Sequence, residues 1–164
     1  MIGPTGPGPG RTPAARLVLI CGLPGAGKTT LARSLAAALH AVRLCPDEWL
    51  ADLGVDVFDE PLRARLERRL RALALDLVAG GRSVVLEFGF WSRAERDELR
   101  LAARDLGVAV ELRFLDVPFE ELVRRVETRD DPGAVRLTRA LMESYRPFFQ
   151  APTPDEIARF DPPQ

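Results

Sequence analysis

The residues best suited to chemistry in this sequence are a glycine-rich run that ends beside its one lysine. Residues 22–29 read Gly-Leu-Pro-Gly-Ala-Gly-Lys-Thr, which fits the phosphate-binding pattern G-x-x-x-x-G-K-[ST] at every position. Of the 23 Lys and Arg residues, all but Lys28 are arginine. The one ammonium group therefore stands where a compact, flexible charge must reach a β- or γ-phosphate. The run predicts a nucleoside triphosphate site.

Each type of residue in this run, called the phosphate loop below, has its own task at such a site. Glycines let the backbone N–H groups turn inward on the phosphates, and the N-terminus of a following helix adds its partial positive charge. The Thr29 hydroxyl is placed to bind Mg²⁺. The residues that we expect to contact the nucleotide are Gly22, Leu23, Pro24, Gly25, Ala26, Gly27, Lys28, Thr29 and Thr30.

The segments that flank the phosphate loop favour this interpretation over a glycine-rich turn that matches by chance. Residues 16–21 form a continuous apolar run, which is typical of a strand buried on both faces of a parallel sheet. Residues 29–40 carry Leu31, Leu35 and Leu39 at intervals of four, which predicts a helix with one apolar face. A strand that enters the loop and a helix that leaves it are the context that the pattern requires.

Short apolar runs and longer amphipathic segments alternate along the rest of the chain. We predict further strands at 42–45, 83–88, 108–115 and 157–160, and helices beginning at 46 and over 61–79, 92–106, 119–129 and 134–149. This alternation is typical of an α/β protein with a parallel sheet. We expect one domain over residues 14–164 with five strands and a helical lid around 120–135. Residues 1–13 are rich in Gly and Pro and are expected to form a flexible tail.

Three acids follow predicted strands, at the sheet edge where ligands of α/β proteins bind. Asp47 could accept the proton of an attacking hydroxyl, or serve only as an acid in the first turn of a helix. Glu87 is predicted to hold Mg²⁺ together with Thr29, with an ordinary strand-end carboxylate as the alternative. Asp116 is explained more simply as a helix cap before Pro118.

Positive charge over the γ-phosphate is the second requirement of phosphoryl transfer, because the transition state spreads negative charge over three oxygens. Arg125 and Arg129 are four residues apart and are predicted to share one helix face directed at the phosphates. The turn sequence at 130–133 would let this segment move as a lid. The alternative is a solvated ion pair between Arg125 and Glu121.

Aromatic residues gather after the third predicted strand, where a surface loop would normally be polar. Phe90 and Trp91, together with Trp49 near the second strand, could form the wall of an acceptor pocket. Packing in the core is the alternative for both tryptophans. Arg93 and Arg96 are candidates for contact with an anionic acceptor, or for a solvated helix face.

Charge and hydropathy exclude several other classes of protein. A net charge of −1 argues against a dedicated nucleic-acid binder, although a small basic groove remains compatible with it. No apolar stretch approaches the ~20 residues of a membrane span, and the N-terminus lacks the order of a signal peptide. We therefore expect a cytoplasmic protein without membrane contact, whose Cys21 and Cys45 are reduced and packed.

Five segments together resemble one family. They are the phosphate loop, Pro46-Asp47-Glu48-Trp49, Glu87-Phe88-Gly89-Phe90-Trp91, Arg124-Arg125-Val126-Glu127-Thr128-Arg129 and Phe149-Gln150-Ala151-Pro152-Thr153-Pro154-Asp155-Glu156. Over residues 16–161 the chain looks like the small P-loop kinases often labelled AAA-type ATP-binding proteins. That group is similar to the 5′-kinase domain of phage-type polynucleotide kinase, to chloramphenicol phosphotransferase and to zeta toxins.

The resemblance implies a three-layer P-loop NTPase fold with strand order 2-3-1-4-5. It also implies a general base at Asp47 and lid arginines at Arg125 and Arg129. Many such kinases have Asp where this chain has Glu87, so the arrangement at the metal is expected to differ by one methylene group.

The leading hypothesis is an ATP- and Mg²⁺-dependent phosphotransferase that moves the γ-phosphate to a hydroxyl of a small-molecule acceptor. Asp47 would activate the hydroxyl, and Lys28 with Arg125 and Arg129 would stabilise the transferring group. One alternative is a polynucleotide 5′-hydroxyl kinase, and net charge argues mildly against it. Another is an ATP-binding switch or weak ATPase without an acceptor.

Overall fold

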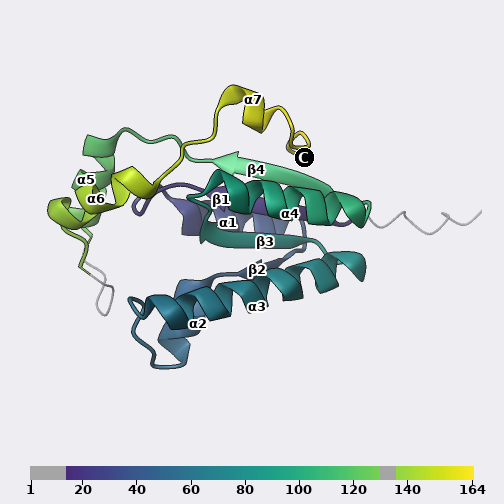
Figure 1. Cartoon of the computed structure of the whole chain (residues 1–164), viewed down its shortest axis with the longest axis horizontal. Coiled ribbons are helices and arrows are strands. Elements are labelled where there is room, and N and C mark those ends of the chain that lie inside the picture. Colours follow the sequence, from purple (N-terminus) through teal and green to yellow (C-terminus); the bar gives the residue numbers. More distant parts are fainter. Residues whose placement is uncertain (1–13, 130–135) are drawn as a thin grey trace, which may run out of the picture.

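Parallel strands with helices on both sides form the centre of the chain (Figure 1). The structure is a computed structural model that describes residues 14–129 and 136–164. Its elements are β1 (Arg16–Cys21), α1 (Lys28–Ala38), β2 (Val42–Leu44), α2 (Pro46–Asp52), α3 (Glu60–Ala79), β3 (Val84–Gly89), α4 (Arg93–Asp105), β4 (Ala109–Phe114), α5 (Phe119–Glu127), α6 (Arg139–Tyr145), the 3₁₀ turn η1 (Arg146–Phe148) and α7 (Pro154–Ile157).

Strand β1 lies in the interior of the sheet, whose order is β2-β3-β1-β4. All three strand pairs are parallel, and Leu17 of β1 is in register with Val84 of β3 and Val110 of β4. Every residue of β1 is buried. The parallel α/β sheet with its phosphate loop directly after a fully buried strand was predicted from the sequence and is confirmed.

The two faces of β1 belong to two different layers of core. Leu17 and Leu19 pack in the cluster that includes residues of α3 and α4, whereas Val18 and Ile20 pack with Ala32 of α1. Figure 1 shows α3 and α4 on one side of the sheet and α1 on the other. Because successive side chains of a strand point to opposite faces, this alternation produces three layers.

The predicted fifth strand at 157–160 is wrong, so among the described residues the sheet has four strands in the order 2-3-1-4. Residues Pro154–Ile157 form the short helix α7, because Thr153 caps its first turn by accepting from the Glu156 N–H at 3.3 Å and Pro154 suits its first position. The chain then turns and follows β4 without forming a strand: the Asp161 N–H donates to the Val110 carbonyl at 2.8 Å, and the Val110 N–H donates to the Asp161 side chain at 2.8 Å.

The helix predicted over 134–149 is also shorter than expected. Residues 134 and 135, the turn at 130–133 and the tail at 1–13 lie outside the described residues. Helix α6 begins after Thr138, which accepts from the Leu141 N–H at 3.3 Å, and it gives way to η1. Pro147 explains the change, because proline cannot donate the hydrogen bond that would continue an α-helix.

No helix in the part of the chain that the structure describes has the length and apolar character needed to cross a membrane. Cys21 and Cys45 are both buried and free, as expected.

Candidate active site

The phosphate loop connects the end of β1 to the first residue of α1. Gly25 and Gly27 have φ angles of 82° and 96°, in the left-handed region that favours glycine. The Gly22 N–H donates to the Gly89 carbonyl at 3.0 Å, which ties the start of the loop to the end of β3. Two of the glycines are therefore required by the backbone path of the loop.

The N-terminus of α1 is suited to an anion. Gly27 is its N-cap, and no described side chain caps it; the first turn carries no acid. The first N–H groups of a helix lack partners within the helix, and together with its dipole they attract phosphate. Thr30 lies exposed in this first turn. This geometry fits the triphosphate that the sequence predicts.

The Lys28 ammonium lies over the loop that precedes it. Its Nζ donates to the Leu23 carbonyl at 3.0 Å. Burial lowers the pKa of Lys28, whereas the negative charges of Asp47 and Glu87 act to raise it. Both acids are thus within electrostatic reach of the amine, so residues from α1, α2 and β3 share one neighbourhood at the carboxyl edge of the sheet.

Glu87 is the buried acid of this neighbourhood. Its side chain is 4 % exposed and its two oxygens have different partners: the Thr29 hydroxyl donates to Oε1, and the Arg43 guanidinium pairs with Oε2. Arg43 also pairs with Glu48 of α2. The sequence interpretation missed Arg43, although an arginine within a predicted strand that precedes Asp47 was a visible signal.

Oxygen ligands at Thr29 and Glu87 fit a magnesium ion. Among residues 14–129 and 136–164, no group of three or more His, Cys, Asp or Glu side chains gathers as a metal site. Mg²⁺ at phosphoryl-transfer sites uses one or two protein ligands, with phosphates and water supplying the rest. The hydroxyl of Thr29 beside the carboxylate of Glu87 is a donor set of this kind.

Asp47 lies in the first turn of α2, after Pro46, and its side chain is 64 % exposed. Arg63 of α3 donates to its Oδ1 through both terminal nitrogens, Nη1 at 2.6 Å. Arg63 in turn lies 3.5 Å from Glu67, whose pKa is raised by burial. Asp47 therefore sits where a helix acid is expected, and it is also exposed and within electrostatic reach of Lys28. The sequence interpretation missed Arg63, because the pairing depends on how α2 packs on α3.

Arg125 satisfies both of the interpretations that the sequence left open. Its Nε pairs with Glu121 at 2.7 Å, and its Nη1 donates to the Gly25 carbonyl of the phosphate loop at 3.4 Å. Helix α5 ends at Glu127, so the exposed Arg129 lies beyond the helix and does not share a helical face with Arg125. The structure thus places Arg125 against the phosphate loop, but it does not place Arg129 on the same helix face as the spacing predicted.

The aromatic residues divide into two groups. Phe90 is 2 % exposed and packs in the core cluster of α3 and α4, so its ring is not part of an acceptor wall, contrary to expectation. Trp49 is 41 % exposed, and Trp91 is half-buried against Tyr145 with ring centroids 5.0 Å apart.

Tyr145 is a further residue that the sequence interpretation missed. Burial raises the pKa of its hydroxyl, and the charges of Glu60 and Asp47 act in the same direction while Arg63 opposes them. Tyr145 of α6 is therefore within electrostatic reach of Asp47, although the two are 98 positions apart in the sequence. An isolated tyrosine in a helix gave no signal of this placement.

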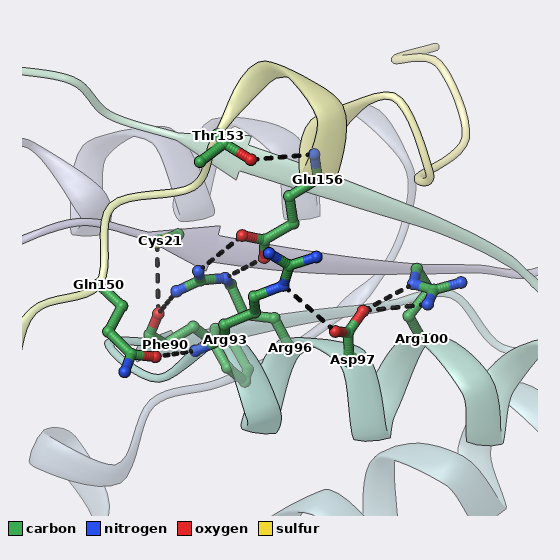
Figure 2. Close-up of polar contacts among 9 residues, drawn as sticks. All are labelled: Cys21, Phe90, Arg93, Arg96, Asp97, Arg100, Gln150, Thr153 and Glu156. Carbon is green, nitrogen blue, oxygen red and sulfur yellow. Dashed lines mark hydrogen bonds and ion pairs between the residues drawn. The ribbon is translucent and has the colours of Figure 1, made fainter.

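The two arginines proposed for an anionic acceptor lie in different environments. Arg93 is 45 % exposed and lies 3.6 Å from Asp97 on the same helix. Arg96 is fully buried and pairs with Glu156, as Figure 2 shows, so it is not available to an acceptor. Asp116 is exposed, and the N-cap of α5 is Pro118 without a side-chain hydrogen bond, so Asp116 is not the predicted cap.

Comparisons with known proteins show what this chain is similar to. A family model described as AAA domain (AAA_33) matches residues 17–152. A shikimate kinase from Corynebacterium glutamicum is 27% identical over 158 residues, which cover 88% of this chain and 84% of the relative. A crystal structure of a sugar kinase from Janibacter sp. is 26% identical, with a TM-score of 0.62, and covers 87% of this chain and 82% of that one.

A chain from the Pnkp1/Rnl/Hen1 RNA repair complex has a TM-score of 0.68 at 20% identity. The match covers 82% of this chain but only 44% of the other, so the chain spans less than half the length of that protein and the likeness is one of fold. The two proteins covered over most of their length, described above, are named shikimate kinase and sugar kinase. The chain belongs to the AAA domain family AAA_33, as a small protein of the P-loop kinase type.

Proposed function

We propose that the protein is a Mg²⁺-dependent kinase that transfers the γ-phosphoryl group of ATP to a hydroxyl group of a small molecule. The observation that carries this proposal is the arrangement at the phosphate loop: Lys28 donates to the loop carbonyl of Leu23, the Thr29 hydroxyl donates to the buried Glu87, and the exposed Asp47 lies within electrostatic reach of Lys28. A phosphate-binding amine, an exposed carboxylate and a buried metal-type carboxylate are the groups that such a transfer needs. Relatives named shikimate kinase and sugar kinase support a small-molecule acceptor.

The proposed roles follow from where each side chain lies. Asp47 accepts the proton of the acceptor hydroxyl as its oxygen attacks the γ-phosphorus. Lys28 and Arg125, with Arg129 just beyond α5, meet the negative charge of the transferring group. Thr29 and Glu87 would hold Mg²⁺, which neutralises charge on the β- and γ-phosphate oxygens when bound.

The acceptor is proposed to bind beside Asp47, between α2 and the loop of residues 90–92 that follows β3. Trp49, Trp91 and Arg93 remain candidates for contact with it, and Tyr145 joins them because it packs on Trp91. A half-exposed aromatic surface with a few polar groups is typical of sites for small organic ligands.

Asp47→Asn tests the assignment of the base. We expect the rate of transfer to fall by about 10²–10⁴-fold while ATP binding, measured by calorimetry, is retained. Asp52→Asn is the matched control, since Asp52 lies exposed on the same helix and its carboxylate forms no ion pair with a described residue. Turnover that survives in the Asp47 variant would contradict the role of the base.

Acceptors are best found by incubating the protein with ATP, Mg²⁺ and a broad panel of hydroxyl compounds. Mass spectrometry would detect the gain of one phosphate. Release of inorganic phosphate without a phosphorylated product would instead support the ATP-binding switch or weak ATPase.

A polynucleotide 5′-hydroxyl kinase is a second candidate because of one surface feature. Arg65, Arg68 and Arg69 lie exposed on α3, and none forms an ion pair with a residue that the structure describes. Such a cluster would suit phosphate groups of a nucleic acid. Labelled ATP with an oligonucleotide that has a free 5′-hydroxyl decides between the candidates, and Arg68→Gln/Arg69→Gln should weaken only the nucleic-acid reaction.

A further inference from the structure

A buried ion pair joins the C-terminal segment to the helix that follows the β3–α4 loop (Figure 2). Arg96 of α4 and Glu156 of α7 have side chains that are 0% and 1% exposed. Two parallel hydrogen bonds connect them, from Nε to Oε1 at 2.6 Å and from Nη2 to Oε2 at 2.9 Å. This planar, two-point contact fixes the orientation of the guanidinium group.

The third arm of the guanidinium holds the backbone of Phe90. Arg96 Nη1 donates to the Phe90 carbonyl at 2.8 Å, and the Cys21 thiol donates to the same oxygen at 3.3 Å. Burial raises the pKa of Cys21 to about 12, so the thiol keeps its proton. Phe90 has a φ angle of 46°, a left-handed conformation that a bulky residue adopts only where its surroundings hold it.

Residues that precede Glu156 contact the rest of the β3–α4 loop. The Gln150 N–H donates to the Trp91 carbonyl at 2.9 Å, and the Gln150 side chain accepts from the Arg93 N–H at 2.8 Å. The Trp91 ring packs on Tyr145. One stretch of chain, residues 145–156, therefore contacts the loop through its backbone and side chains, and contacts α4 through an ion pair.

We propose that Arg96 and Glu156 are positioning residues for the acceptor side of the site. The pair holds the Phe90 carbonyl and so keeps the next residue, Trp91, against Tyr145. The use of Trp91 by an acceptor rests on the proposed function. The control of the loop by the buried pair does not.

An ion pair at this place needs a reason, because two well-packed apolar side chains are often at least as stable as a buried pair. A guanidinium group has five donors in a fixed plane, and Arg96 uses three of them on two carboxylate oxygens and one carbonyl. Apolar side chains cannot hold that carbonyl. A buried ion pair at this place is thus explained by the hydrogen bond from Arg96 that holds the Phe90 carbonyl.

Trp91 itself can report on the loop. The sequence has two tryptophans, so Trp49→Phe leaves Trp91 as the sole indole. In that background, Arg96→Met/Glu156→Leu removes both buried charges together, a change that proteins tolerate. Arg100→Gln/Asp97→Asn is the matched control, since it removes a less buried pair of the same helix.

We expect the Met/Leu variant to keep its far-UV circular dichroism spectrum and a cooperative unfolding transition. Acrylamide should nevertheless quench Trp91 more efficiently than in the parent, and its emission should shift to longer wavelength, whereas the control should match the parent. Unchanged quenching in the folded variant would overturn the proposal. If that variant does not fold, Arg96→Lys gives the same two outcomes, because lysine keeps the charge beside Glu156 but lacks the planar fork that also reaches Phe90.

Kinetics with an acceptor that the wild-type protein phosphorylates, measured with Trp49 present, separate a positioning role from a general destabilisation of the fold. We expect kcat/KM for the acceptor to fall by about 10²-fold in the Met/Leu variant while the KM for ATP stays unchanged. An equal loss for both substrates would count against the proposal. If the wild-type chain phosphorylates no acceptor, the proposed function fails, and the quenching of Trp91 still decides the positioning role.

Discussion

Gly25 is the position at which a single methyl group should be felt most strongly. A β-carbon added there would lie 2.8 Å from Val126 Cγ1 and 3.1 Å from the Leu122 carbonyl oxygen, both on α5. At Gly27 an added β-carbon meets no described atom within 4 Å. The two glycines have similar backbone conformations, with φ angles of 82° and 96°, so the pair isolates the effect of contact with α5.

The magnitudes follow from two contributions. A residue with a β-carbon in the left-handed region loses about 1–2 kcal/mol, and the lower entropy of its unfolded chain returns about 0.4–1 kcal/mol. Gly27→Ala should therefore lower the free energy of unfolding by about 0–1.5 kcal/mol. Overpacking against α5 adds about 1–3 kcal/mol, so Gly25→Ala should lower it by about 1–4.5 kcal/mol.

Thermal and urea unfolding without nucleotide measure this difference independently of any activity. For a chain of this size, we expect the Tm of Gly25→Ala to lie about 2–12 °C below that of Gly27→Ala. Gly54→Ala is a second control, since Gly54 has a φ angle of 66° and open surroundings in the described structure. Equal midpoints for Gly25→Ala and Gly27→Ala would refute the direct packing of α5 on the phosphate loop.

Other predictions concern charge. Lys28→Met should raise the Tm without nucleotide, because burial lowers the pKa of Lys28, and it should abolish the increase of the Tm with ATP. Between that lowered pKa and 10.5, the unfolded chain binds more protons than the folded protein. The stability of the wild type should therefore rise with pH in this range, and that of the variant should not. A lower Tm of the variant would contradict this. Glu156→Leu alone should cost about 3–5 kcal/mol in urea unfolding because it leaves Arg96 buried without its partner, and adding Arg96→Met should restore most of that; a loss below about 1 kcal/mol would count against a buried charge. Glu121 should titrate near pH 2 by NMR rather than at 4.5, because hydrogen bonds from Arg124 and Arg125 lower its pKa to about 2, and their stabilisation should be present above pH 4.5 and lost as the pH falls to about 2. A midpoint near 4.5 would show that these contacts do not persist in solution.

Local sequence signals were sufficient where a segment depends on its own residues. The apolar run at 16–21, the glycines after it and the leucines at intervals of four predicted β1, the phosphate loop and α1. The same holds for the three other strands, whose predicted bounds differ from the observed ones by at most one residue. The roles of Lys28, Asp47 and Arg125 stay predictions.

Features that depend on contacts between residues distant in the sequence could not be predicted from local patterns. Residues 157–160 are mostly apolar and suggested a strand, but Glu156 turns inward to Arg96, 60 positions earlier, and the cap at Thr153 starts a helix instead. Arg96 was expected on a solvated or acceptor-facing surface because its buried partner, Glu156, is distant in the sequence. Arg43, Arg63 and Tyr145 enter the candidate site only through packing between elements, which periodicity does not encode.

The solitary amine of Lys28 has a practical consequence for labelling. It is the only lysine in the sequence, and its lowered pKa leaves more of it unprotonated, and therefore nucleophilic, than an ordinary surface lysine at neutral pH. An acylating reagent would thus find one side-chain target, at the floor of the nucleotide cradle. Protection from acylation would then count the fraction of molecules that carry a ligand, without radioactivity and before any acceptor is known.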